Sequence, residues 1–223
     1  MRIAIIIPAY NESSTIAHSI MVASEYGAVL VVDDGSVDKT GEVAAATGAT
    51  VVRLEENRGY DNALQAGFES ASGLGVDAIV TFDADGEHRP EALRQVIQAL
   101  RSDKVDMVIG VRDRIPRFSE VLFNMYTRFR FNVPDIVCGL KGYRLSLYQR
   151  HGCFDNDRSI GTQLALWGLR NKVPYSLVAV KTGKRADSPR LGAFLRGNYV
   201  ILRAFFRAVF RDIRNSARVT GKP

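Results

Sequence analysis

The chain has 223 residues, of which 46% are hydrophobic and 24% are charged, and its formal net charge is +6. This composition suits one globular domain with a buried core, and 7 Pro and 19 Gly are too few for a linker-rich or low-complexity protein. The two cysteines, Cys138 and Cys153, give neither a disulfide framework nor a metal-ligand spacing. We expect two reduced thiols in a cytosolic protein.

The sequence predicts neither a secretory signal nor a membrane-spanning helix. The apolar run at the N-terminus stops at Pro8 and lacks a small-residue cleavage site. Residues 194–210 are interrupted by three arginines, and no run reaches the roughly 18 apolar residues that a spanning helix needs. We therefore expect a cytoplasmic protein.

The charges are distributed unevenly along the chain. Residues 1–100 carry 15 acidic and 6 basic side chains, whereas residues 181–223 carry 2 acidic and 11 basic ones. An acidic N-terminal part and a basic C-terminal part of the sequence indicate two kinds of partner. We expect a cation or cation-bridged ligand at the acidic part and an anionic surface or group at the basic part.

Strands and helices alternate in the first half of the sequence. Short runs rich in Val and Ile predict strands at 2–8, 28–33, 49–53, 77–83 and 105–111. Helical patterns lie between them, at 14–25, 38–47, 61–72 and 91–101. This alternation predicts an α/β fold with a mostly parallel sheet flanked by helices.

The second half is less regular. We predict helices over 116–131 and 159–171, a turn-rich loop over 135–144 with two glycines, and a late strand over 174–180. No repeat or linker divides the chain in two. We expect one domain over residues 1–190, followed by a separate helical segment over residues 191–223.

The last segment has a strong helical periodicity. Six arginines share one stripe of a helix, at positions 196, 203, 207, 211, 214 and 218. We expect the opposite side to be covered by apolar residues, namely Phe194, Ile201, Leu202, Phe205, Val209 and Ile213. Such an amphipathic basic helix is typical of a membrane interface with anionic lipids. The alternative is a helix packed on the domain with a solvated arginine face.

Polar segments follow each of the first four predicted strands, at 8–12, 33–36, 57–60 and 83–88. In parallel α/β sheets, ligands bind beyond the carboxyl ends of the strands. Three of the four segments contain carboxylates, which would repel one another unless a cation or a hydrogen-bonding ligand lies between them. We infer a divalent metal held by oxygen ligands together with a diphosphate.

Asp83 and Asp85 are two residues apart on an extended segment, so both carboxylates can face one pocket. One can hold a ribose or a metal-bound water while the other coordinates the metal, and Glu87 can supply a third oxygen. Carboxylate oxygens favour Mg²⁺ or Mn²⁺ over zinc. Taken alone, the same pattern is also compatible with a solvated loop.

Asp33 and Asp34 open a predicted turn, where a carboxylate can accept hydrogen bonds from a nucleobase, and Tyr10 offers a ring for stacking. The alternative is ordinary turn chemistry, because Asp-Gly-Ser sequences favour turns. Glu12 likewise could serve only as an acidic residue near a helix N-terminus.

In order and spacing, these motifs resemble the family 2 glycosyltransferases, which have the GT-A fold. The motifs are Pro8-Ala9-Tyr10-Asn11-Glu12, Val31-Val32-Asp33-Asp34-Gly35-Ser36, Asn57-x-Gly59 and Asp83-Ala84-Asp85-Gly86-Glu87-His88. Three later segments resemble the dolichyl-phosphate mannose synthase and polyprenyl-phosphate glycosyltransferase branch: Arg117-x-Ser119, Asp135-x-x-Cys138-Gly139-Leu140-Lys141 and Arg185-x-x-Ser188-x-Arg190.

The resemblance implies a role for each matching residue. Nucleoside binding would fall to Pro8, Tyr10, Glu12, Asp33 and Asp34. The ribose, the diphosphate and Mg²⁺ or Mn²⁺ would be bound by Asp83, Ala84 and Asp85, with Glu87 as a further metal ligand. Acceptor phosphate binding would fall to Arg117, Ser119 and Arg185, and catalysis to Asp83, Asp85, Arg117 and Arg185.

The sequence departs from the family pattern at three positions. Asp61 stands where relatives often have Gly, Leu140 replaces a Phe, and Gln163 is the nearest match to an acid that the corresponding helix often carries. Enzymes that glycosylate a hydroxyl often need such an acid as a base. A phosphate acceptor is already ionised at pH 7 and needs none.

We therefore predict an inverting transfer of a sugar from a nucleotide-sugar donor to a polyprenyl phosphate, on the cytoplasmic face of an anionic membrane and with no nucleic acid partner. The alternative within the family is a carbohydrate hydroxyl as acceptor. Two other classes remain: a phosphatase of the haloacid dehalogenase type, whose F-D-x-D-G signature resembles residues 82–86, and a membrane-bound adaptor without turnover. The sequence does not identify the sugar, the nucleotide base or the oligomeric state.

Overall fold

The computed structural model describes residues 1–84, 90–102, 104–115, 117–182 and 191–220. The first half contains β1 (Ile3–Ala9), α1 (Ile16–Ser24), β2 (Ala28–Asp33), α2 (Thr40–Ala46), β3 (Thr50–Arg53), α3 (Tyr60–Ser72), β4 (Ala78–Thr81) and α4 (Pro90–Arg101). The second half contains β5 (Met107–Arg112), α5 (Phe118–Phe131), β6 (Lys141–Arg144), α6 (Leu145–His151), α7 (Gln163–Arg170), β7 (Tyr175–Val180) and α8 (Leu191–Thr220).

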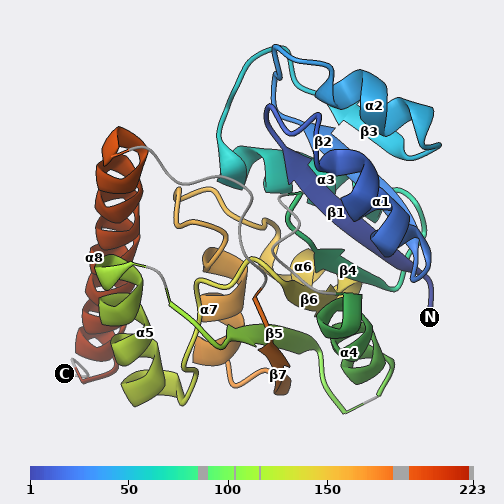
Figure 1. Ribbon diagram of the computed structural model, residues 1–223. Coiled ribbons are helices and arrows are strands. Elements are labelled where there is room, and N and C mark those ends of the chain that lie inside the picture. Colours follow the sequence, from blue (N-terminus) through green and yellow to red (C-terminus); the bar gives the residue numbers. More distant parts are fainter. Residues whose placement is uncertain (85–89, 103, 116, 183–190, 221–223) are drawn as a thin grey trace.

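The strands form one seven-stranded sheet in the order β3-β2-β1-β4-β6-β5-β7. All neighbours are parallel except β6, which is antiparallel to both β4 and β5. The predicted α/β fold with a mostly parallel sheet and flanking helices is therefore confirmed (Figure 1). All five predicted strands and all four helices of the first half are present, with bounds that differ by a few residues.

The prediction of a loop over 135–144 is wrong for its last four residues, which form β6 in the middle of the sheet. The segment Lys141-Gly142-Tyr143-Arg144 is too short and too polar to show a strand pattern on its own. Its pairing with two neighbours supplies the stability that its sequence lacks. Gly142 also allows a close approach, because a Cβ atom there would lie 2.6 Å from Leu100 Cδ1.

Two further elements differ from the prediction. Helix α6 was not predicted, and α7 begins at Gln163 rather than at residue 159. The later start has a local cause, because Ile160 and Gly161 have φ angles of 57° and 62°. Residues in this left-handed region cannot belong to a right-handed helix.

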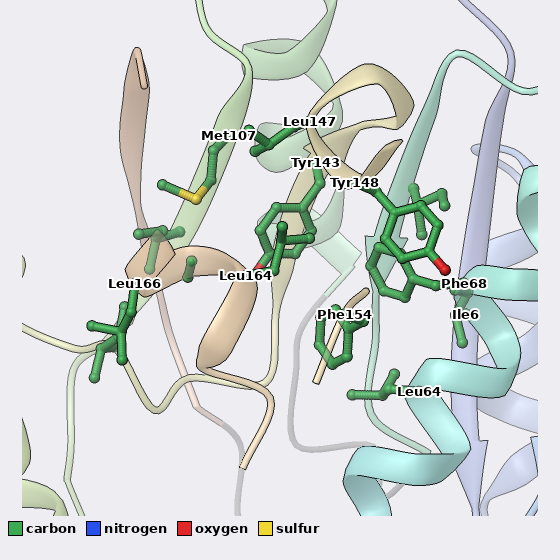
Figure 2. Packing of buried hydrophobic residues seen from close by; sticks show 14 of the residues in the cluster. Ile6, Leu64, Phe68, Met107, Tyr143, Leu147, Tyr148, Phe154, Leu164 and Leu166 are labelled. Carbon is green, nitrogen blue, oxygen red and sulfur yellow. The ribbon is translucent and has the colours of Figure 1, made fainter. Parts of the chain in front are cut away.

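Apolar side chains cover both faces of the sheet. On β1, Ile5 and Ile7 face the core beneath α1 and α4, whereas Ala4 and Ile6 face the core beneath α3. This two-sided burial explains the near-continuous apolar run of the strand. The core beneath α3, here called the aromatic core, is rich in aromatic rings, which Figure 2 shows around Phe68.

The terminal helix α8 lies beside α5 at one edge of the molecule (Figure 1). Its residues Ile201, Ala204 and Ala208 are buried in the aromatic core, and the ring of Phe205 packs against Phe123. The predicted apolar face is therefore divided, because Ile201 is buried whereas Ile213 is 60% exposed. Among the described helices, none is both long and apolar enough to cross a membrane.

Phe68 is the centre of the aromatic core. Its ring stacks on Phe154 with centroids 4.4 Å apart and contacts the rings of Tyr143 and Tyr148. Replacing a buried Phe with Ala costs about 3–5 kcal/mol through lost burial and the cavity left behind. We expect Phe68→Ala to lower the melting temperature by about 10 °C, measured by calorimetry. Leu74→Ala, at an exposed position, is the control, and equal melting temperatures for the two variants would contradict the packing.

Candidate functional site

A cleft of about 410 Å³ lies beyond the carboxyl ends of β1, β2, β4 and β5. Its lining comes from the segments that follow these strands and from α3, α5, the loop before β6 and α8. Four of the lining residues are acidic and two are arginines: Glu12, Asp34, Asp83, Glu120, Arg112 and Arg117. The cleft is thus where the sequence predicts ligand binding.

Asp34 connects the segments that follow β2 and β3. Its carboxylate accepts hydrogen bonds from the backbone N–H groups of Arg58 and Gly59, both at 2.8 Å. Gly59 has a φ of 88°, which favours glycine over other residues. The carboxylate therefore shapes the Asn57–Gly59 turn against the cleft.

Asp33 lies elsewhere, although it neighbours Asp34 in the sequence. It is fully buried, accepts from the N–H of Ser36 at 2.9 Å, and lies 3.7 Å from the Arg53 guanidinium. Its other oxygen has no hydrogen bond among the described residues. Asp33 does not line the cleft, so the contact of this carboxylate with a nucleoside stays a prediction.

The first polar segment lines the cleft through Pro8, Tyr10 and Glu12. Tyr10 is 45% exposed and lines the cleft, where its ring can stack on a base. Glu12 accepts from the hydroxyl of Thr15 at 2.9 Å, and the Glu12 backbone N–H donates to the hydroxyl of Thr40 at 2.8 Å. This segment is fixed by helix α2 as well as by its own turn.

Asp83 lines the cleft together with Ala84 and accepts a hydrogen bond from the Tyr60 hydroxyl at 3.2 Å. The Asp83 carboxyl lies directly against Gly139, where an added Cβ atom would come within 2.0 Å of Asp83 Oδ2. Only glycine leaves room for the carboxyl in this position.

Two predicted metal ligands, Asp85 and Glu87, lie outside the described residues. Within the residues that are described, no group of three or more His, Cys, Asp or Glu side chains forms a metal site. The Asp83 carboxylate supplies an oxygen donor of the kind that Mg²⁺ and Mn²⁺ prefer, so the described part of the cleft fits the predicted ion in its chemistry.

A network of charges forms the opposite wall of the cleft. Arg112 donates two hydrogen bonds to Asp135, at 2.8 and 3.0 Å, and one to Glu120 at 2.7 Å. Glu120 also accepts from Arg117 at 3.1 Å. Although burial opposes its charge, hydrogen bonding to Asp135 and the charges of Asp135 and Glu120 raise the pKa of Arg112 above its usual value. Arg112 therefore stays positive at the edge of the cleft.

Sequence reasoning found Arg117 but missed Arg112 and Glu120. Arg112 is the last residue of β5, where the rule of ligand binding at strand ends could have identified it. Glu120 offered no such signal, because an acid in the first turn of a helix usually has only a capping role.

The other two predicted acceptor-phosphate residues are placed differently. Ser119 is buried, and its hydroxyl donates to Asn198 of α8 at 2.6 Å, so it joins α5 to α8 rather than lining the cleft. Arg185 lies outside the described residues. Their contacts with phosphate stay predictions.

The position where relatives often have glycine holds a carboxylate that supports the cleft. Asp61 accepts from the backbone N–H groups of Ile160 and Gly161, at 3.1 and 2.7 Å, and Ile160 lines the cleft. Asp155 also accepts from Gly161, at 3.1 Å. Two carboxylates thus hold a strained turn, since Ile160 adopts a left-handed conformation that β-branched residues rarely take.

Gln163 does not line the cleft and binds the backbone of a neighbouring loop. Its side-chain oxygen accepts from the backbone N–H groups of Asn156 and Asp157, at 3.0 and 3.2 Å. This side chain therefore orders the preceding loop.

Comparison with known proteins identifies the family. A model described as glycosyl transferase family 2 matches residues 4–160, a stretch that includes the segments after β1, β2, β4 and β5. The chain belongs to glycosyl transferase family 2. The family expected from the strand-end motifs is thereby confirmed, and with it the assignment as a glycosyltransferase.

Related proteins carry names from the expected branch. An undecaprenyl-phosphate mannosyltransferase of Micrococcus luteus is 34% identical over 165 residues, which cover 65% of this chain and 67% of that protein. A UDP-N-acetylglucosamine–dolichyl-phosphate N-acetylglucosaminyltransferase of Methanococcus voltae is 32% identical over 134 residues, about half of each chain. An uncharacterized protein of Methanocaldococcus jannaschii is 38% identical over 198 residues, 81% of each chain. The predicted resemblance to the polyprenyl-phosphate branch is confirmed.

The fold also matches solved structures. The glucosyl-3-phosphoglycerate synthase of Mycobacterium tuberculosis, solved with Mn²⁺, UDP and glucosyl-3-phosphoglycerate, superposes with a TM-score of 0.73. The match covers 94% of this chain and 79% of that one at 19% sequence identity. At this identity the likeness concerns the fold, and it confirms the predicted GT-A architecture.

The contact between Gly139 and Asp83 gives a first prediction about the cleft. Gly139→Ala should push the Asp83 carboxyl out of position and lower sugar transfer by at least about tenfold, because misplaced groups lose catalytic interactions. Transfer rates and melting temperatures measure the effect. The control is Gly73→Ala, where an added Cβ would lie 3.7 Å from its nearest neighbour. Equal transfer by both variants would contradict the role of this contact.

The pair formed by Asp61 and Asp155 gives a second prediction. Burial and the neighbouring Asp155 carboxylate raise the pKa of Asp61 to about 6. The folded state then binds the Asp61 proton more tightly than the unfolded state. The protonated Asp61 side chain therefore stabilises the folded state fully below about pH 4, and this contribution is lost as the pH rises through about 6. We expect Asp61→Asn to flatten this part of the curve of melting temperature against pH. Parallel curves for the variant and the unsubstituted protein would contradict the assignment.

Proposed function

We propose that the protein transfers a sugar, with inversion, from a nucleotide-sugar donor to a polyprenyl phosphate. The observation that carries this proposal is the distribution of charge in the cleft. Carboxylates from the ends of β1, β2 and β4 line one side, and Arg112 and Arg117, joined by Glu120, line the other. The first side suits a nucleoside and a metal-bound diphosphate, and the second suits an anionic acceptor.

The donor would occupy the side formed by the first half of the sheet. There Tyr10 offers its ring to the base, Asp34 orders the adjacent turn, and Asp83 faces the ribose and diphosphate. A divalent ion, Mg²⁺ or Mn²⁺, would be held by Asp85 and Glu87 with Asp83 nearby, and when bound it neutralises the charge of the leaving diphosphate. Several solved structures of the same fold contain Mn²⁺ or Mg²⁺ together with UDP.

The acceptor phosphate would lie at the arginine side. Glu120 and Asp135 hold Arg112 in place and Glu120 holds Arg117, so the two guanidinium groups can orient an anion with little further cost in ordering. An ionised phosphate oxygen attacks the anomeric carbon from the face opposite the diphosphate. The bond from that carbon to the diphosphate oxygen breaks as the new bond forms, and no proton has to be removed.

The polyprenyl tail requires the protein to work beside a membrane. We place it on the cytoplasmic face as a peripheral protein, held by α8. Relatives named as undecaprenyl-phosphate and dolichyl-phosphate transferases support this acceptor class.

The test is transfer of labelled sugar from UDP- and GDP-sugars, with Mn²⁺, to a polyprenyl phosphate and to free saccharides. We expect product only on the polyprenyl phosphate, with the opposite anomeric configuration. Asp83→Asn should lower kcat/KM by at least about 100-fold, because it removes a charge from the centre of the cleft, whereas Glu91→Gln on α4 should not change it.

Each rival function predicts a different result in this assay. Transfer to a saccharide hydroxyl but not to the lipid would favour the carbohydrate alternative. Release of phosphate from a sugar phosphate without an acceptor would indicate a phosphatase. Full activity of Asp83→Asn would refute the role of Asp83.

A further inference from the structure

The terminal helix α8 presents three different faces. One face is buried in the core through Ile201, Ala204 and Ala208. A second face carries the arginines at positions 203, 207, 211 and 214. The third is apolar and points to solvent, with side chains that are 57–68% exposed: Leu195, Tyr199, Phe206, Phe210 and Ile213. These five lie within a stripe of about 60° around the helix, so they form a continuous apolar surface.

The arginine face borders a hollow of about 730 Å³ between α8 and the segment 156–158, here called the arginine groove. Five guanidinium groups line it against one carboxylate, that of Asp157; the arginines are Arg158, Arg203, Arg207, Arg211 and Arg214. Such an excess of one charge attracts an anion with several oxygen atoms, because a guanidinium group matches phosphate geometry.

Two of the five arginines are already engaged, since Arg207 and Arg211 both donate to Asp157. The other three, Arg158, Arg203 and Arg214, make no hydrogen bond or ion pair within the described parts of the chain. The Nε atom of Arg203 is moreover buried without a partner. A buried donor left in this state costs free energy, so the groove can receive an acceptor that the described part of the chain does not supply.

The arginine groove continues into an apolar recess on the outer face of α8. The recess has a volume of about 470 Å³ and is lined by Tyr199, Leu202 and Phe206. Arg203, Arg207 and Phe210 line both hollows. A ligand that fills both would carry an anionic group next to a hydrocarbon chain.

We propose that the arginine groove binds the phosphate headgroups of anionic phospholipids, while the apolar stripe and recess of α8 enter the acyl region of the same leaflet. This proposal rests on the membrane-bound function proposed above and names the surface that performs it. The geometry is that of an interfacial helix, in which aromatic residues lie below the headgroups and basic residues lie at their level.

Helix α5, which contacts α8, also exposes apolar side chains. Its residues Phe118, Met125 and Phe129 are 78%, 63% and 94% exposed and share one face, and α5 lies beside α8 (Figure 1). Large apolar side chains exposed on two neighbouring helices are unusual on a protein that contacts only water. Because Arg117, at the start of α5, lines the cleft, the same surface brings the acceptor side of the cleft to the bilayer.

The arginine groove is distinct from the transfer cleft. The two share no lining residue, although they approach each other closely along the chain. Ile160 and Ile201 line the cleft, whereas Arg158 and Arg203, two residues before and two residues after them, line the groove. The groove is therefore a second site for lipid phosphate, separate from that of the acceptor.

The test measures co-sedimentation of the full chain with vesicles of phosphatidylcholine, with and without phosphatidylglycerol. The variant replaces the three unengaged arginines: Arg158→Gln, Arg203→Gln and Arg214→Gln. The matched control removes three positive charges around α4: Arg94→Gln, Arg101→Gln and Lys104→Gln. We expect the variant to bind anionic vesicles about 100-fold more weakly, since each basic group near the surface contributes roughly fivefold. The control should bind nearly as well as the unsubstituted protein.

A second variant tests the apolar stripe. Phe206→Ser with Phe210→Ser should also reduce binding to anionic vesicles by at least about tenfold, because two aromatic rings no longer leave water. Val37→Ser with Leu74→Ser, at exposed positions elsewhere, is the control and should bind normally.

Three results would overturn the proposal. The first is equal vesicle binding by the arginine variant and its control. The second is an increase in melting temperature with inorganic pyrophosphate that depends on the three arginines, without any binding to anionic vesicles, which would indicate a soluble ligand. The third is a dimer in sedimentation analysis that Phe206→Ser with Phe210→Ser abolishes, which would assign the stripe to a second copy of the chain.

Transfer by the unsubstituted protein to a short-chain, water-soluble prenyl phosphate separates this proposal from the proposed function. Transfer without arginine-dependent vesicle binding refutes the lipid site alone. Arginine-dependent vesicle binding without any transfer refutes the proposed function and leaves the lipid site supported.

Discussion

Strand β6 enters the sheet antiparallel between β4 and β5, and the cleft depends on this insertion. Strand β6 joins β3, β2, β1 and β4 to β5 and β7. Residues at the ends of strands on both sides of β6 therefore line one cleft. The loop that leads into β6 places Gly139 against the Asp83 carboxyl. The first residue of β6, Lys141, is buried and donates to the carbonyl oxygens of Cys138 and Gly161. This short strand and the loop before it thus position two parts of the cleft, the Asp83 carboxyl and the turn at Gly161.

The cleft keeps its opposite charges apart because each is held by the fold. Asp34 is bound by backbone N–H groups, and Arg112 is bound by Asp135 and Glu120. Burial of such charges is tolerable only when they are paired or hydrogen-bonded. The protein's own hydrogen bonds and ion pairs therefore position these charges, as positioning catalysis requires. Family 2 membership and the geometry of the cleft both support the same proposal.

Much of the fold followed from local patterns, because parallel strands buried on both faces leave long apolar runs such as Ile3–Ala9. The strand-end rule likewise led to Tyr10, Glu12, Asp34 and Asp83, all of which line the cleft. Strand β6 escaped because its stability comes from its neighbours rather than from its own four residues. The role of Asp61 could not be predicted for a related reason, since its partners Ile160 and Gly161 are distant in sequence. The role of Glu120 could not be predicted because an acid in the first turn of a helix usually only caps it. The exposed stripe of α8 could not be told from its buried stripe, because both are apolar and only packing separates them.

The central claim is that the acidic edge of the sheet binds a nucleotide sugar together with a divalent ion. Isothermal titration calorimetry of UDP- and GDP-sugars, in Mn²⁺ and in EDTA, measures this most directly. The account predicts binding of one nucleotide class with a one-to-one stoichiometry, weakened at least about tenfold when the ion is removed, since the diphosphate charge is then left uncompensated. Absence of heat for either nucleotide in Mn²⁺, or equal affinity in EDTA, would contradict it.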